Sequence, residues 1–183
     1  MTAISEFQKV VYDNKFRTLI DDKQIQNRIQ ELGKEITKDY QGKEPILIGV
    51  LNGCFIFFAD LVRHVECDLE IDFIKLSSYG DEKVSSGKVE ILKDINADLR
   101  NRHVLIVEDI VDTGLSINFL KQKLINLKPA SLKIVSLLLK KEKAKVDFDI
   151  DYVGFEISNE FVVGYGLDHK QVLRNLPAVY VMD

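Results

Sequence analysis

Apolar residues recur along part of the chain with the period of a helix. Between residues 21 and 40 they are spaced by four, three and four positions, which places them on one helical face. These positions are Ile25, Ile29, Leu32 and Ile36. Asp21 or Asp22 can cap the start of this segment, so the pattern predicts an amphipathic helix with one side against a core.

Uninterrupted apolar runs predict strands that are buried on both faces, as in a parallel sheet. The clearest runs are residues 45–51, 104–107 and 132–139. Further strands are expected at 69–78, 89–92, 152–157, 161–165 and 179–182, and further helices at 54–65 and 117–127. The alternation of strand and helix predicts an α/β fold, with a mainly parallel twisted sheet flanked by helices.

Length and charge narrow the class of protein. The chain has 183 residues, which indicates a single domain over residues 1–183. Lys and Arg total 25 and Asp and Glu total 29, and this net charge of −4 argues against nucleic-acid and membrane-surface binding. The first ten residues lack an apolar signal segment, and Cys54 and Cys67 form no metal pattern. We therefore expect a cytoplasmic protein with reduced thiols.

The segment richest in chemistry follows the apolar run at 104–107. Three carboxylates come first, and small or hydroxyl residues then open a helix. In order, these are Glu108, Asp109 and Asp112, then Thr113, Gly114, Leu115 and Ser116.

Backbone amides and hydroxyls at a helix N-terminus favour a phosphate. An adjacent acidic pair can accept hydrogen bonds from a ribose diol or hold Mg²⁺. The segment therefore predicts a site for a phosphorylated ribose with a divalent ion. The alternative, in which Asp112 and Thr113 only cap a helix, leaves the other two acids unexplained.

Residues 104–116 (Val-Leu-Ile-Val-Glu-Asp-Ile-Val-Asp-Thr-Gly-Leu-Ser) resemble the phosphoribosyl-diphosphate signature of type I phosphoribosyltransferases. Other segments resemble the hypoxanthine-guanine branch of that family. Residues 51–53 are similar to its diphosphate loop, 77–87 to its mobile catalytic loop, and 161–168 with Arg174 to its purine-binding end. The resemblance implies a type I phosphoribosyltransferase fold, with a small hood built from the N-terminal segment and residues 158–183.

The resemblance also implies a reaction. The expected substrates are 5-phosphoribosyl 1-diphosphate and a 6-oxopurine base, hypoxanthine or guanine, with Mg²⁺ as cofactor. The products would be IMP or GMP and diphosphate, and a homodimer or homotetramer is expected. Two alternatives stay open: a transferase that prefers xanthine or a pyrimidine, and a non-catalytic regulator that senses phosphoribosyl diphosphate.

By the same resemblance, Glu108 and Asp109 would contact the ribose hydroxyls and residues 112–116 would bind the 5′-phosphate. Asp112 would also be the general base at purine N7. Lys140 would donate to the purine O6, Phe161 would stack on the base, and the carbonyl of Val162 would accept from its edge. The diphosphate would be held by Leu51, Asn52, Gly53 and Arg174.

The metal and the mobile loop complete the implied site. Glu108, Asp109 and Asp168 would hold Mg²⁺, and Asp168 would also lie at the purine site. Residues 78–87 would form the mobile loop, with Ser78 and Tyr79 over the reacting centre. The lysines that follow Lys140 in the sequence, Lys141, Lys143 and Lys145, are expected to be solvated.

Overall fold

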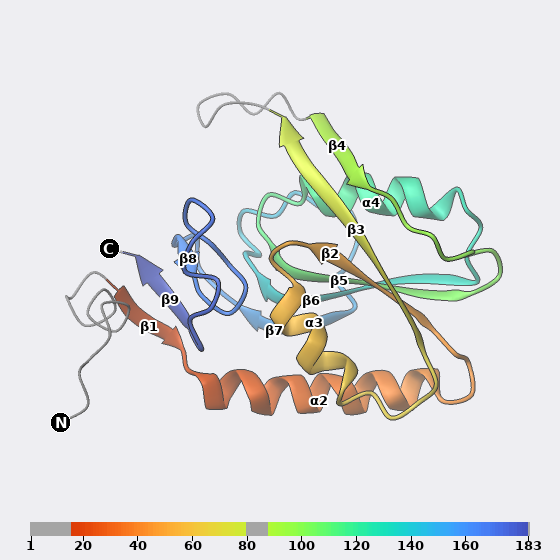
Figure 1. Ribbon diagram of the computed structural model, residues 1–183, viewed down its shortest axis with the longest axis horizontal. Helices are drawn as coiled ribbons and strands as arrows, with labels where there is room; N and C mark the ends of the chain where they lie inside the picture. The colour runs from red at the N-terminus through yellow and green to blue at the C-terminus, as the bar shows by residue number, and fades with distance from the viewer. Residues whose placement is uncertain (1–15, 80–87, 183) are drawn as a thin grey trace.

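A six-stranded sheet forms the centre of the computed structural model, which describes residues 16–79 and 88–182 (Figure 1). The strand order is β4-β3-β2-β5-β6-β7, and only the β3–β4 pair is antiparallel. The strands are β2 (Ile46–Leu51), β3 (Glu70–Tyr79), β4 (Lys88–Lys93), β5 (His103–Val111), β6 (Ser131–Leu139) and β7 (Tyr152–Glu156). The predicted α/β fold with a mainly parallel sheet is confirmed.

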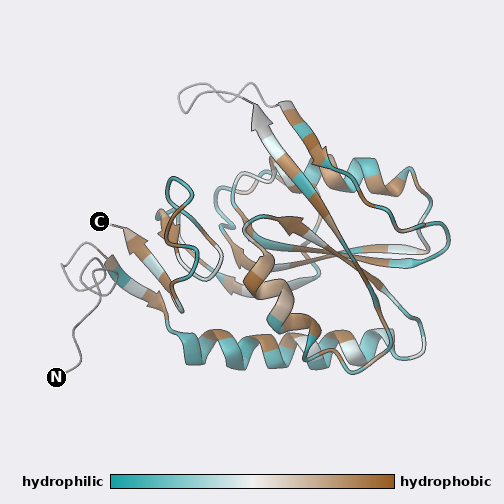
Figure 2. Cartoon of the chain, viewed as in Figure 1, coloured by the Kyte–Doolittle hydropathy of each residue, from teal (hydrophilic) through white to brown (hydrophobic). Residues whose placement is uncertain are grey.

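Helices cover both faces of this sheet. The buried residues of α2 (Asp22–Tyr40) and α3 (Phe55–Val62) join one apolar cluster, and those of α4 (Leu115–Ile125) join the cluster on the opposite face. All four predicted inward positions of α2 are fully buried, while its outer side is polar (Figure 2). Asp21 caps α2 by accepting from the amide of Gln24, whose side chain accepts from the amide of Asp21 in return.

A second, three-stranded sheet forms the hood at one end of the molecule (Figure 1). Its order is β1-β9-β8, from β1 (Phe16–Ile20), β9 (Val179–Met182) and β8 (Val162–Val163), and both pairs are antiparallel. The strand expected at 161–165 is only two residues long, because Gly164, Tyr165 and Gly166 all have positive φ and turn the chain away. The expected hood, built from N-terminal and C-terminal segments of the chain, is therefore present as this sheet.

Two sequence-based boundaries need correction. The strand predicted at 104–107 continues to Val111, since Glu108, Ile110 and Val111 still pair with β6. Glu108 and Asp109 are therefore part of β5 rather than of the loop that follows it. Likewise, Ser78 and Tyr79 end strand β3 and pair with β4, whereas residues 80–87 of the expected mobile loop lie outside the described residues.

Both cysteines are free thiols, as expected. Within residues 16–79 and 88–182, no helix has the length and apolar character that crossing a membrane requires.

The carboxylate of Asp72 in β3 fastens the connection that follows β4. It accepts hydrogen bonds from the amides of Asn96 at 2.5 Å, Ala97 at 3.0 Å and Phe73 at 2.7 Å, and from Lys93 Nζ at 3.2 Å. Burial alone would raise the pKa of Asp72, but these donors outweigh it and hold the pKa at about 2. The ionised carboxylate therefore stabilises the folded chain.

We predict that Asp72→Asn lowers the free energy of unfolding by about 2 kcal/mol at pH 7 and by about half as much at pH 3. The folded pKa lies below the unfolded value of about 3.9, so this contribution is present above pH 4 and is lost as the pH falls through 2. Urea unfolding at both pH values measures it. Asp98→Asn, at an exposed aspartate with a single amide donor, is the control; equal losses at pH 7 and pH 3 would contradict the prediction.

Candidate active site

Three parallel strands end side by side at the edge of the sheet that faces the hood (Figure 1). The chain leaves β2 at residues 52–53, β5 at 112–116 and β6 at Lys140. Two backbone hydrogen bonds tie the last two segments together, from the Lys140 amide to the Val111 carbonyl and from the Lys145 amide to the Thr113 carbonyl, both 3.0 Å. This is the edge at which open α/β sheets bind their ligands.

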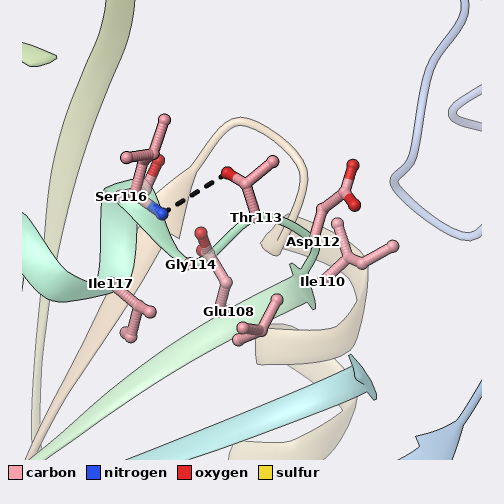
Figure 3. A pocket seen from close by; sticks show the side chains of 9 residues that line it. Glu108, Ile110, Asp112, Thr113, Gly114, Ser116 and Ile117 are labelled. Atoms are coloured by element: carbon pink, nitrogen blue, oxygen red, sulfur yellow. Dashed lines mark hydrogen bonds between the residues drawn. The ribbon is translucent and has the colours of Figure 1, made fainter. Parts of the chain in front are cut away.

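The turn from β5 into α4 encloses a small cavity of about 80 Å³ (Figure 3). Gly114 begins the helix with φ 87°, and a Cβ atom there would come within 2.7 Å of Val146. The Oγ1 of Thr113 accepts from the amide of Leu115 at 3.4 Å. The cavity is lined by Glu108, Ile110, Val111, Asp112, Thr113, Gly114, Leu115, Ser116 and Ile117. Because the first amides of a helix lack partners within the helix, this cavity suits an anion.

Glu108 contributes a buried carboxyl group to the same cavity, pointing toward the turn at Gly114 (Figure 3). Glu108 is only 8% exposed, and none of the described residues donates a hydrogen bond to its Oε2. Burial, and then the adjacent Asp109, raise the pKa of Glu108 well above its ordinary value. An arriving hydroxyl group would satisfy this oxygen, which fits a ribose.

The loop after β2 is in close contact with Asp109. A Cβ atom on Gly53 would lie 1.7 Å from Asp109 Oδ2, and one on Gly166 would lie 2.0 Å from the Gly53 carbonyl oxygen. The peptide bond between Leu51 and Asn52 is cis. Burial raises the pKa of Asp109 to about 6, although Arg174 opposes this shift. Gly53 is thus packed between a carboxylate and the hood, where no side chain fits.

A second cavity, of about 220 Å³, lies between the strand ends and the hood. Lys140 is 4% exposed there, and its Nζ lies 3.6 Å from Asp112 Oδ1. The ring of Phe161, 49% exposed, forms part of the wall. The full lining is Asp109, Ile110, Asp112, Lys140, Phe161, Val162, Leu167 and Asp168. The structure therefore brings together all four residues expected to bind a purine.

Three residues of this region were not anticipated from the sequence. Ile110 lines both cavities and Leu167 lines the larger one. Lys143 is exposed, as expected, but it also lies 2.8 Å from Asp112 Oδ1 and donates to Oδ2 at 3.0 Å. Ile110 lies between predicted site residues in the sequence, and this position could have indicated that it lines the site. The contact of Lys143 with Asp112 depends on a turn that the sequence pattern does not indicate.

The expected metal ligands divide between the two cavities. Asp109 and Asp168 line the larger one, but Glu108 lines the smaller, since neighbouring side chains of β5 point to opposite faces. Among the described residues, no three Asp, Glu, His or Cys side chains converge in a metal-binding group. Mg²⁺ is commonly held by one or two carboxylates together with phosphate oxygens, and Asp109 with Asp168 fits that kind of site.

Arg174 lies beside this acidic pair. Its Nη2 is 2.6 Å from Asp168 Oδ1, and its Nη1 donates to the Gly166 carbonyl at 2.8 Å. The guanidinium is therefore directed toward Asp168 and the Gly166 turn, which packs on the loop at residues 51–53.

Comparisons with known proteins agree with this geometry. The phosphoribosyl transferase domain family matches residues 18–170. A hypoxanthine-guanine phosphoribosyltransferase of Bacillus subtilis is 46% identical over 166 residues, which cover 91% of this chain and 92% of that protein. Another, from Aquifex aeolicus, is 44% identical over 176 residues, covering 96% of this chain and 99% of that protein.

Solved structures extend the agreement to the fold. The crystal structure of a hypoxanthine-guanine phosphoribosyltransferase from Bacillus anthracis is similar, with a TM-score of 0.86 and 46% identity, over 91% of this chain and 98% of that chain. A hypoxanthine phosphoribosyltransferase from Staphylococcus aureus gives a TM-score of 0.90 and 41% identity, over 95% of both chains. The type I phosphoribosyltransferase fold is confirmed, and the chain belongs to the phosphoribosyl transferase domain family.

Proposed function

We propose that this chain transfers the 5-phosphoribosyl group of 5-phosphoribosyl 1-diphosphate to N9 of hypoxanthine or guanine, giving IMP or GMP and diphosphate in purine salvage. The names of the relatives described above support this reaction. The observation that carries it is the pair formed by Lys140 and Asp112 in one cavity with the ring of Phe161. These groups match the edge and the face of a 6-oxopurine.

Base recognition follows from the positions of these groups. O6 and N7 are neighbours on one edge of a 6-oxopurine, so a donor and a carboxylate 3.6 Å apart can address them together. Lys140 donates to O6 and disfavours adenine, whose amino group would place donors against an ammonium. Phe161 stacks on the base, a contact worth about 1–3 kcal/mol, and the carbonyl of Val162 accepts from the N1 or N2 edge.

The other residues hold the donor substrate. Residues 112–116 bind the 5′-phosphate at the start of α4, and Glu108 accepts from a ribose hydroxyl. The loop at 51–53 and Arg174 hold the diphosphate, with Arg174 as a two-pronged donor. In the reaction, N9 bonds to the anomeric carbon as that carbon's bond to diphosphate breaks, and Asp112 takes the proton from N7.

Asp109 and Asp168, with oxygens of the substrate, would hold Mg²⁺. When bound, this ion supplies positive charge that makes the diphosphate a better leaving group. Burial raises the pKa of Asp109 to about 6, so a bound cation would stabilise the ionised form of this carboxyl group.

Several further expectations remain predictions. A loop at 78–87, entered through Ser78 and Tyr79, would cover the reacting centre. The chain would act in the cytoplasm and would bind neither nucleic acid nor membranes. It would form a homodimer or homotetramer, and light scattering would measure this oligomeric state.

A steady-state assay with hypoxanthine, guanine, xanthine, adenine and uracil, each with and without Mg²⁺, tests the proposed function. We expect turnover with hypoxanthine and guanine only when Mg²⁺ is present. Faster turnover of xanthine than of the other bases would favour a xanthine-preferring transferase. Binding of 5-phosphoribosyl 1-diphosphate without turnover of any base would favour a non-catalytic regulator.

We predict that Asp112→Asn lowers kcat about 10²- to 10⁴-fold, the usual contribution of a general base, while affinity for 5-phosphoribosyl 1-diphosphate stays within about threefold. The amide keeps the shape of the side chain but cannot take the proton from N7. Rapid-quench kinetics and calorimetry measure the two quantities. Asp94→Asn, at another aspartate paired with a lysine but outside both cavities, is the matched control. An unchanged kcat would remove this role from Asp112.

We predict that Lys140→Ala lowers the preference for guanine over adenine, measured as the ratio of kcat/KM, by at least about tenfold, since a buried hydrogen bond from a charged donor is lost. Lys141→Ala is the control, because that neighbouring lysine is exposed and pairs with Glu156. Unaltered selectivity in Lys140→Ala would show that base recognition lies elsewhere.

A further inference from the structure

A tight turn at residues 164–167 joins the hood to the candidate active site. Gly164 and Leu167 exchange backbone hydrogen bonds of 3.0 and 3.1 Å, and the intervening Tyr165 and Gly166 both have positive φ. Tyr165 has a φ of 50°, which is uncommon for an aromatic residue. Its amide donates a hydrogen bond to the Leu176 carbonyl at 2.9 Å. The surroundings therefore fix this turn in one conformation.

The turn contacts both halves of the site. On one side, Leu167 and Asp168 line the base cavity. On the other, Gly166 packs against the carbonyl of Gly53 in the proposed diphosphate loop. Gly166 and Arg174 also bond to each other in both directions: the Gly166 amide donates to the Arg174 carbonyl, and Arg174 Nη1 donates to the Gly166 carbonyl, each at 2.8 Å.

Tyr165 anchors the turn on the body of the molecule. The residue is only 3% exposed, and its hydroxyl donates to Oδ2 of Asp60 on α3. Gln26 of α2 donates through Nε2 to the same carboxylate oxygen at 3.2 Å and to the tyrosine hydroxyl at 3.4 Å. The hydroxyl is thus held by side chains from two helices at once.

Helix α3 makes this contact relevant to the diphosphate loop. The helix begins two residues after Gly53, and the amide of Phe58 bonds to the Cys54 carbonyl at 2.7 Å. Helix α3 therefore connects Asp60 to the loop at 51–53. The contacts form a closed circuit that runs from Gly53 along α3 to Asp60, across to Tyr165, and through Gly166 back to Gly53.

We propose that Tyr165, through its hydrogen bond to Asp60, is a positioning residue that holds Gly166 against Gly53 and so aligns the diphosphate subsite with the base subsite. The inference rests on the proposed function for the identity of the two subsites. Tyr165 lines neither of the two cavities, so it acts through the turn and not on the substrate.

The test is Tyr165→Phe, which removes the hydroxyl and keeps the ring. We expect KM for 5-phosphoribosyl 1-diphosphate to rise about three- to tenfold, as suits the loss of one hydrogen bond to a charged group, with KM for hypoxanthine within about twofold. Tyr152→Phe is the matched control, because Tyr152 is also buried and donates to a carboxylate, Asp39 Oδ2 at 2.6 Å, away from both cavities. Equal KM values in the two variants would overturn the proposal.

A double-mutant cycle separates coupling from general loosening. Asp60→Ala should raise KM for the diphosphate substrate as Tyr165→Phe does, and the double variant should be no worse than the more impaired single variant. Additive effects would mean that the two residues act independently, which contradicts the circuit.

Amide hydrogen exchange tests the positioning without any reaction. Gly166 and Leu167 should exchange at least about tenfold faster in Tyr165→Phe than in Tyr152→Phe, since the turn loses its anchor. Equal exchange rates would overturn the inference. If the wild-type chain turned over none of the bases, the proposed reaction would fail, while this exchange measurement would still decide whether Tyr165 holds the turn.

Discussion

The parallel pairing of β2, β5 and β6 is the constraint on which the site depends. Its register sets Gly49 beside Val107, and Val111 beside Leu139, so the three strands end near one another. Each end then supplies a different chemistry: a glycine loop, a helix start with carboxylates, and a buried lysine. Residues about 90 positions apart in the sequence are thus brought together by backbone hydrogen bonds, which do not depend on the identity of their side chains.

Crowding of negative charge is the main electrostatic cost of this arrangement. Glu108, Asp109, Asp112 and Asp168 line adjoining cavities, which under the proposed function also take phosphates. The structure reduces the repulsion in two ways. Lys140 and Lys143 flank Asp112, and Arg174 pairs with Asp168. Burial raises the pKa of Glu108 and of Asp109, which disfavours the charged form of both carboxyl groups.

Sequence patterns predicted the layers of the fold because burial imposes them locally. The four inward residues of α2 follow the helical period, and the apolar runs of β2, β5 and β6 follow from burial on both faces of the sheet. The end of β5 was placed too early, since Glu108 and Asp109 are polar residues that pairing with β6 nevertheless keeps in the strand. Strand β1 was not predicted, because its five residues pair only with β9, at the far end of the chain.

The site was anticipated more completely than its internal contacts. Residue type and motif order indicated Lys140, Asp112, Phe161 and Asp168, which the structure gathers in one cavity. They gave no indication of the contact between Lys143 and Asp112 or of that between Tyr165 and Asp60, since both depend on how turns fold. Such contacts join positions far apart in the chain, and no local period records them.

The close packing of Gly166, Gly53 and Asp109 implies a division of labour in how this architecture can change. Under the proposed function, the wall on the leaving-group side is glycine main chain packed against the Asp109 carboxylate and against the turn at Gly166, and a Cβ atom added to either glycine would collide. The acceptor side is built from the side chains of Lys140, Phe161 and their neighbours, which can be exchanged one at a time. A scaffold of this kind can acquire a new nucleobase while its handling of the sugar donor stays constant.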